Sequence, residues 1–242
     1  MTLNWISPAA FTIGGYTITC DYALGGSKRQ STDHDFTIMK ARNFFDHYTS
    51  LIHGNYKKIL ELGVYQGGSF VFLDQLLKPS RIAGIEISNV PIPGLDKYVA
   101  ENGDHARLYY GTSQDDVARL RTIVDEDFGG ELDLVVDDAS HLYELTKASF
   151  TTLFPLVRPG GLYIIEDWSW SFEAPYQEPD NCWFNQSAPA NLMLDLMEDM
   201  TMRKLIESVH VERELLKIRR SQHSGGELFT SQARRGRQLN LL

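Results

Sequence analysis

The sequence predicts an α/β protein with a doubly wound, mostly parallel sheet. Apolar, β-branched runs alternate along the chain with stretches of helical periodicity, and units of this kind in series build parallel sheets. Two of the runs, LDLVVDDASH (132–141) and GLYIIEDWSW (161–170), end abruptly in acidic residues. Acids at the carboxyl ends of neighbouring parallel strands face the crevice where such proteins bind ligands, so this edge of the sheet is the expected site.

Each element follows from its local pattern. Strands are expected at 58–62, 81–88, 106–111, 132–138 and 161–167, with helices at 69–77, 115–127 and 142–157 between them. The RPGG run at 158–161 ends the last of these helices. Farther along, residues 191–207 predict a helix, and 208–220 predict two short strands that form an antiparallel pair at the sheet edge. The sheet is therefore expected to be mostly parallel with an antiparallel edge.

The segments outside these strand–helix units are expected to have other kinds of structure. Residues 11–19 alternate around a Gly pair and predict a hairpin, and Asp33 to Ile52 shows helical spacing of apolar residues. The segment 168–190 is rich in Trp, Tyr, Phe and Pro, and a long irregular loop of this kind commonly covers a site. We therefore expect an N-terminal cap at 1–55, a catalytic domain at 56–220 and a C-terminal tail at 221–242. The tail is expected to be mobile or to order on a partner subunit of a homo-oligomer.

The composition excludes several function classes. The 242 residues carry a formal net charge of −9, which argues against a nucleic-acid partner because phosphate binding needs a basic face. Two distant cysteines, Cys20 and Cys182, make neither a disulfide framework nor a zinc motif, so we expect a reducing cytoplasm. Residues 1–15 lack the basic and apolar regions of a signal peptide, and no apolar run is long enough to span a membrane.

A glycine-rich turn and two acids predict the first ligand. The turn GVYQGGS (63–69) follows a strand and leads into a helix, where glycines let the backbone approach a ligand. Glu61 ends the first strand, and a carboxylate there repels phosphate but attracts an ammonium group. Glu86 ends the second strand, where an acid can accept hydrogen bonds from ribose hydroxyls. S-adenosylmethionine has a ribose and an ammonium group but no phosphate; the alternative is that both acids are merely solvated strand ends.

The acids of the later strands predict a metal site and a base. Asp138, Glu166 and Asp167 are hard oxygen ligands suited to Mg²⁺, with Mn²⁺ as a substitute. Successive strand residues point to opposite faces, so Glu166 and Asp167 can share an ion only if the strand ends between them. By the same rule the side chains of Asp137 and Asp138 point to opposite faces. Asp137 is therefore expected to lie on the cofactor side or to make a structural hydrogen bond. His141 follows in the next turn and can take a hydroxyl proton near neutral pH; alternatively, Ser140 and Asp138 cap the next helix and His141 is a surface residue.

These motifs resemble those of class I methyltransferases that use S-adenosylmethionine, in particular metal-dependent O-methyltransferases. ELGVYQGGS (61–69) and GTSQD (111–115) are similar to the catechol type. The GVYQGGS turn, DDASH (137–141) and the Glu166-Asp167 pair after a Pro-Gly-Gly turn resemble macrocin and mycinamicin sugar O-methyltransferases and the cephalosporin hydroxylase group. The catechol type carries lysine at the position of His141, so the base follows the sugar-modifying group.

The resemblance implies a seven-stranded, Rossmann-like methyltransferase sheet and a small-molecule acceptor. It also implies roles along the cofactor, in which the amino acid part contacts Glu61, Gly63, Tyr65, Gly67 and Ser69, the ribose contacts Glu86, and the adenine contacts Ser113 and Gln114.

The leading hypothesis is a Mg²⁺-dependent O-methyltransferase that acts on a natural-product sugar or another vicinal diol. A catechol-type phenolic acceptor is the alternative within this class. A nicotinamide oxidoreductase on the same sheet is a second alternative, disfavoured because Glu61 repels phosphate and Tyr65 fills a position that the dinucleotide motif reserves for glycine. A third is a cofactor-binding module without chemistry, which would have no need of the acids and His141.

Overall fold

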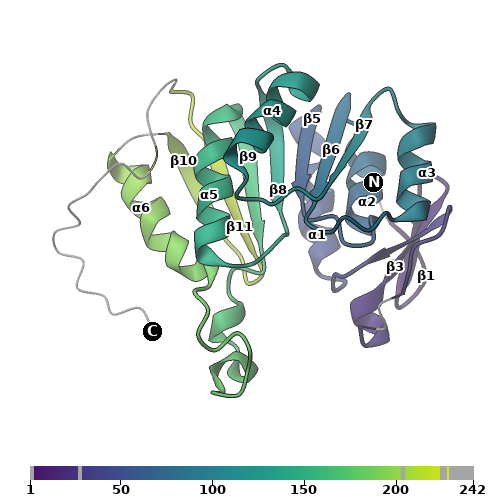
Figure 1. The fold of residues 1–242 in the computed structure, drawn as a ribbon, viewed down its shortest axis with the longest axis horizontal. Helices are drawn as coiled ribbons and strands as arrows, with labels where there is room; N and C mark the ends of the chain where they lie inside the picture. The colour runs from purple at the N-terminus through teal and green to yellow at the C-terminus, as the bar shows by residue number, and fades with distance from the viewer. Residues whose placement is uncertain (1–2, 27–28, 203–204, 224–227, 229–242) are drawn as a thin grey trace.

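The fold is built on one seven-stranded sheet, as the sequence predicts. The computed structural model describes residues 3–26, 29–202, 205–223 and 228. The sheet order is β10-β11-β9-β8-β5-β6-β7, and the neighbours from β9 to β7 all pair in parallel (Figure 1). The strands are β5 (Lys58–Leu62), β6 (Arg81–Glu86), β7 (Ala106–Tyr110), β8 (Leu132–Asp137), β9 (Val157–Glu166), β10 (Ile206–Val211) and β11 (Leu215–Arg220). The antiparallel edge is confirmed: β11 runs against both β9 and β10.

Helices cover both faces of this sheet. They are α1 (Phe44–Thr49), α2 (Gly68–Leu77), α3 (Pro93–Glu101), α4 (Val117–Phe128), α5 (Tyr143–Leu153) and α6 (Leu192–Met202). Short 3-10 helices are η1 (Asp21–Leu24), η2 (Ser50–Gly54), η3 (Phe154–Leu156), η4 (Trp170–Phe172), η5 (Ala174–Gln177) and η6 (Pro189–Asn191). In β8, Leu134 and Val136 pack in the cluster with α1, α2 and α3, whereas Val135 packs with α4, α5 and α6. This alternation is why the strands are apolar throughout.

The strand order reverses direction beside β5, and this reversal positions the site. The chain leaves β5 toward β6 and β7 on one side, then returns to β8 and β9 on the other. Leu62 pairs with Asp137, and Asp137 pairs with Ile165, so the ends of β5, β8 and β9 lie level with one another. The residues that follow these ends therefore meet at one edge of the sheet, at the switch point where ligands bind in α/β proteins.

A second, four-stranded sheet precedes the main one. It consists of β1 (Asn4–Ser7), β2 (Ala10–Ile13), β3 (Tyr16–Cys20) and β4 (Asp35–Ile38). The hairpin expected at 11–19 is confirmed, with Gly14 and Gly15 both at positive φ in its turn. This sheet packs on α2 through Phe11 and Phe72, whose ring centroids are 5.6 Å apart. The N-terminal segment is therefore part of the same core as the main sheet.

Two expectations about the helices are wrong. The helix expected from Asp33 to Ile52 is limited to α1 and the 3-10 turn after it, because Phe36 and Ile38 are buried in β4, which pairs in parallel with β3. Tertiary pairing here outweighs the local helical spacing. Helix α3 was not expected, although Pro93 stands in its first turn, where proline is tolerated. The RRGR run at 234–237 lies outside the described residues, and the domain boundaries stay a prediction.

Across the residues that the structure describes, no helix has the length and apolar character needed to cross a membrane.

Candidate active site

The glycine-rich turn after β5 brings two strand ends into contact. Gly63 has φ +82°, and a Cβ there would collide with the carbonyl oxygen of Asp138 at the end of β8. Gly67 has φ +83° and immediately precedes α2, in which Ser69 is buried in the first turn. Tyr65 also has a positive φ, and its backbone N–H donates to Glu86 Oε2 at 3.2 Å. The turn therefore places backbone, and no side chain, between the ends of β5 and β8.

A cavity of about 870 Å³ lies against this turn. The residues predicted to contact a cofactor that line it are Gly63, Tyr65, Glu86, Ser113 and Gln114. Asp138 lines the same cavity, as do Gln30 and Ser31 of the N-terminal segment. We call it the large cavity. Its lining joins the ends of β5, β6 and β8 with the loop after β7, the set of elements that the sequence predicted to hold one ligand.

Glu61 is a buried acid at this switch point, although it does not line the large cavity itself. Its side chain is 0% exposed, and neither carboxylate oxygen has a hydrogen-bond partner among the described residues. Burial raises its pKa to about 8, against the lowering influence of Ser69 and Lys40. An unpartnered carboxylate is costly to bury, so a positively charged ligand group beside it would relieve that cost.

Glu86, Ser113 and Gln114 have partners that fix their positions. Glu86 accepts backbone N–H groups from Tyr65 and Ser88, and the Ser113 hydroxyl donates to Asp115. Gln114 Oε1 accepts the backbone N–H of Ser140 at 2.8 Å. These contacts join the loops that wall the large cavity.

Asp137 makes the structural hydrogen bonds that were one of its two expected roles, and its contact with a cofactor stays a prediction. Its carboxylate accepts from Ser149 Oγ at 2.7 Å, from the Tyr163 hydroxyl at 2.8 Å and from Gln114 Nε2 at 3.2 Å. Burial raises its pKa to about 6, while the Ser149 and Tyr163 donors lower it. Asp137 is absent from the lining of the large cavity, so it supports the site from behind through Gln114.

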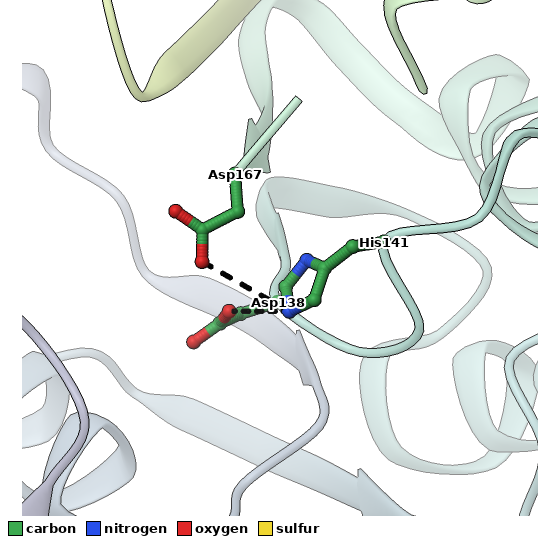
Figure 2. Close-up of side chains that lie close together, drawn as sticks. All are labelled: Asp138, His141 and Asp167. Carbon is green, nitrogen blue, oxygen red and sulfur yellow. Dashed lines mark ion pairs between the residues drawn. The ribbon is translucent and has the colours of Figure 1, made fainter. Parts of the chain in front are cut away.

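Asp138, His141 and Asp167 come together at the edge of the sheet (Figure 2). His141 Nε2 lies 3.7 Å from Asp138 Oδ1 and 4.0 Å from Asp167 Oδ2. One ligand atom from each residue lies within 4.8 Å of the others. The condition set by the sequence is met, because β9 ends at Glu166 and Asp167 has φ +49°. The turn after the strand therefore aims Asp167 at Asp138 and His141.

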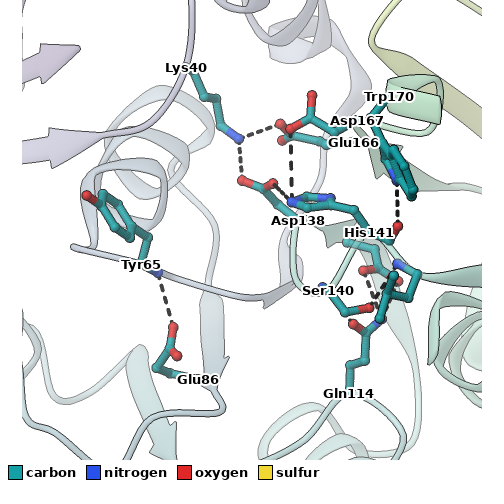
Figure 3. A network of polar contacts seen from close by, with 12 residues as sticks. Lys40, Tyr65, Glu86, Gln114, Asp138, Ser140, His141, Glu166, Asp167 and Trp170 are labelled. Atoms are coloured by element: carbon teal, nitrogen blue, oxygen red, sulfur yellow. Dashed lines mark hydrogen bonds and ion pairs between the residues drawn. The ribbon is translucent and has the colours of Figure 1, made fainter. Parts of the chain in front are cut away.

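Glu166 is buried and has protein partners on both oxygens, and Figure 3 shows one of them, Lys40. Oε2 accepts from the ammonium group of Lys40, and Oε1 accepts from the Tyr48 hydroxyl. Burial and the neighbouring Asp138 raise the pKa of Glu166 to about 8, although Lys40 and Tyr48 oppose this. Of the three predicted metal ligands, the structure thus groups Asp138 and Asp167 with His141 and sets Glu166 behind them.

Lys40 and Tyr48 were not predicted as site residues from the sequence. Lys40 is 3% exposed, and its Nζ also bonds Asp138 Oδ2 at 2.6 Å. Burial lowers the pKa of Lys40, but Asp138 and Glu166 raise it above its usual value, so the ammonium stays charged. Its partners are 98 and 126 residues away in the chain, and a contact over such a separation leaves no local pattern to recognise.

Asp138, His141, Glu166 and Asp167 are together called the acidic cluster. A second cavity of about 430 Å³, the small cavity, opens on the other side of it. His141 and Asp167 line it, together with Met39, Ala41, Asn43 and Phe44 of the N-terminal segment. The aromatic loop at 168–190 supplies Trp170, Tyr176 and Trp183. Asp138 lines the large cavity, so the acidic cluster stands between the two.

The aromatic side chains of the loop at 168–190 differ in role: some line the small cavity and others do not. Trp170 is buried, stacks its edge on Tyr176 and Trp183 with ring centroids 5.1 and 5.0 Å away, and donates from Nε1 to the carbonyl of His141 at 2.8 Å. Trp168 instead bonds the Glu212 carbonyl, and Phe172 is 71% exposed. The hydrogen bond from Trp170 holds the backbone of His141, which itself has φ +54°.

The residues present fit a hard divalent cation. Asp138, His141 and Asp167 each offer one ligand atom within 4.8 Å of the others, and two of the three atoms are carboxylate oxygens of the kind that Mg²⁺ prefers. Burial and Asp138 also raise the pKa of Asp167. The alternative in which Asp138 caps the next helix is not seen, since α5 has no side-chain cap and Asp138 bonds Lys40.

Comparison with known proteins identifies the central part of the chain. Residues 60–168 match a family model described as a methyltransferase domain. These residues form a methyltransferase domain. The matched range holds every residue that we predicted for the site, which confirms the resemblance inferred from the motifs.

Curated relatives modify sugars on natural products. A tetracenomycin-C rhamnosyl 3'-O-methyltransferase from Streptomyces olivaceus is 35% identical over 130 residues, which cover 51% of this chain and 30% of that protein. Mycinamicin VI 2''-O-methyltransferase from Micromonospora griseorubida is 31% identical over 159 residues, which cover 62% and 36%. The chain thus aligns with about a third of the length of these relatives.

Solved structures agree with the fold. MycE methyltransferase from the mycinamycin pathway, in complex with Mg, SAH and mycinamycin VI, superposes with a TM-score of 0.56 at 26% identity, over 76% of this chain and 50% of that one. A caffeoyl-CoA O-methyltransferase homologue from Staphylococcus aureus has the same fold, with a TM-score of 0.56 at 16% identity over 76% of this chain and 86% of that one.

Proposed function

We propose that the chain is a Mg²⁺-dependent O-methyltransferase that transfers a methyl group from S-adenosylmethionine to a hydroxyl of a natural-product sugar or similar vicinal diol. The observation that carries this proposal is the position of Asp138, His141 and Asp167 between the large and small cavities. A donor in one cavity and an acceptor in the other would meet at these three side chains. Methyl transfer needs this alignment more than any other contribution.

The large cavity would hold the methyl donor. The buried, unpartnered carboxylate of Glu61 would bind the ammonium of the methionine part, and the carboxylate of Glu86, which lines the cavity, would bind the ribose. Gly63 and Gly67 let the backbone follow the ligand, with Tyr65 and Ser69 beside them, while Ser113 and Gln114 border the adenine. Glu61 disfavours a phosphate, and Tyr65 stands where the dinucleotide motif has glycine, which supports S-adenosylmethionine over a nicotinamide dinucleotide.

Asp138 and Asp167 would hold the cation, with Glu166 behind them. A bound Mg²⁺ would supply a charge that polarises the acceptor hydroxyl and lowers its pKa. His141 is the proposed base: its Nε2 faces Asp138 and Asp167 and can take the proton that the hydroxyl releases. Trp170 keeps His141 in place through the backbone hydrogen bond.

The small cavity would hold the acceptor. Its aromatic walls at Phe44, Trp170, Tyr176 and Trp183 suit the apolar faces of a sugar ring. The relatives, which include rhamnosyl tetracenomycin and mycinamicin methyltransferases, favour a sugar on a larger natural product. The same aromatic walls would also accept a flat phenolic ring, so a catechol-type acceptor is the second candidate.

A screen of glycosylated and phenolic acceptors with S-adenosylmethionine and Mg²⁺, read by mass spectrometry, tests the proposal. Methylation of glycosylated compounds that ceases in excess EDTA and returns with Mg²⁺ is the expected result. Full activity in EDTA would refute the metal requirement, and binding of NAD in place of S-adenosylhomocysteine by calorimetry would refute the donor. A homo-oligomer in the cytoplasm stays a prediction, which light scattering and fractionation of the source cells would check.

A further inference from the structure

Lys40 bonds two carboxylates of the acidic cluster from outside residues 60–168, the range that matches the methyltransferase model. It lies between β4 and α1, and its neighbours Met39 and Ala41 line the small cavity. Figure 3 shows its side chain reaching from this segment to the carboxylates of Asp138 and Glu166. A lysine that is 3% exposed in this position is held there by charge.

The contacts of Lys40 decide which oxygens of the cluster are available. Its Nζ bonds Asp138 Oδ2 at 2.6 Å, and the other oxygen, Oδ1, faces His141 Nε2 at 3.7 Å. Lys40 and Tyr48 together occupy both oxygens of Glu166. Among Asp138, Glu166 and Asp167, the oxygens without a bond to Lys40 or Tyr48 are therefore Asp138 Oδ1 and those of Asp167. Asp138 lines the large cavity, and Asp167 lines the small cavity.

We propose that Lys40 is a built-in cation of the acidic cluster, and that its positive charge sets how tightly the cluster holds an added divalent metal. The inference rests on the proposed function. The ammonium neutralises part of the charge on Asp138 and Glu166, so an added Mg²⁺ meets fewer free carboxylates and a repelling charge beside them. The N-terminal segment thereby takes part in metal binding, although it lies outside residues 60–168.

The test is a calorimetric titration of Mg²⁺ into the full chain saturated with S-adenosylhomocysteine. Lys40→Met removes the charge and should tighten Mg²⁺ binding at least about tenfold, because a unit charge beside a divalent ion is worth more than 1 kcal/mol even at a high effective dielectric constant. Lys40→Gln also removes the charge but keeps a hydrogen-bond donor, and it serves if the methionine variant does not fold. Lys40→Arg keeps the charge and should bind like wild type.

Two control variants distinguish the effect of the Lys40 charge from that of a general disturbance of the structure. Tyr48→Phe removes a hydrogen bond to Glu166 but no charge, and should leave the Mg²⁺ affinity nearly unchanged. Lys147→Met takes a lysine from the buried Asp195, which is outside the acidic cluster, and should also leave it unchanged. Weaker or equal binding by both neutral Lys40 variants would overturn the inference while the proposed function stands. If wild type binds no Mg²⁺, both the inference and the metal requirement fail, whereas binding of S-adenosylhomocysteine still reports on the donor site.

Discussion

The substitution Glu61→Gln should make the ligand-free protein more stable and its donor site weaker. The folded protein holds the pKa of this buried acid at about 8, against an ordinary value of 4.5. Because the folded state binds the proton more tightly, the wild type loses stability as the pH rises from 4.5, and the loss is complete above 8. Because pH 7 lies 2.5 pH units above the ordinary pKa of 4.5, the wild type has lost about 3 kcal/mol of its free energy of unfolding at pH 7.

Glutamine has nearly the same shape and no such cost. Its buried amide would itself lack partners, which destabilises the variant by roughly 1 to 2 kcal/mol. The expected net gain in the free energy of unfolding at pH 7 is therefore about 1 to 2 kcal/mol. For a chain of this size that corresponds to a Tm higher by roughly 2 to 8 °C. Saturating S-adenosylhomocysteine should raise the Tm of the wild type and have much less effect on the variant, since the ammonium has lost its carboxylate.

Scanning calorimetry between pH 5 and 9, with and without S-adenosylhomocysteine, measures both effects. The stability difference between variant and wild type should be small at pH 5, grow up to about pH 8 and then level off. Glu86→Gln is the matched control, because Glu86 already accepts two backbone N–H groups and its loss should not stabilise the protein. A Glu61→Gln variant that is less stable at pH 8, or that responds fully to the ligand, would refute the reasoning.

Three further outcomes are expected. His141→Ala should lower turnover by about 10² to 10⁴ while S-adenosylhomocysteine and Mg²⁺ still bind, and a loss of Mg²⁺ binding in calorimetry would make His141 a ligand instead of the base. Asp167→Asn should weaken Mg²⁺ binding at least about tenfold without changing donor affinity; unchanged Mg²⁺ binding would remove Asp167 from the metal site. Trp170→Phe keeps an aromatic ring but loses the hydrogen bond to the His141 carbonyl, and steady-state kinetics should show a lower kcat, whereas a normal kcat would show that this bond is dispensable.

The sheet and its acids could be predicted because their signals are local. The run Lys58–Leu62 is a strand in both the prediction and the structure, and Glu166 and Asp167 stand at the end of another apolar run. In contrast, the segment Asp35–Ile38 was expected to be helical, because its strand form depends on pairing with β3. Sequence periodicity cannot show that partner.

The same reasoning explains what was missed in the site. Lys40 joins Asp138 and Glu166 across most of the chain, so no spacing rule connects them. The structural hydrogen bonds of Asp137 come from three donors in different parts of the chain, which its place at the end of a strand could not show. Motifs therefore located the acids, and tertiary packing determined which of them face the cavities.

The central claim is that donor and metal sites adjoin at Asp138 and Asp167. A crystal of the full chain grown with S-adenosylhomocysteine and Mn²⁺ tests it most directly, because Mn²⁺ gives an anomalous signal. The account predicts an anomalous peak beside Asp138 and Asp167 and adenosine density against Glu86 and Gln114. A peak elsewhere, or adenosine outside the large cavity, would contradict it.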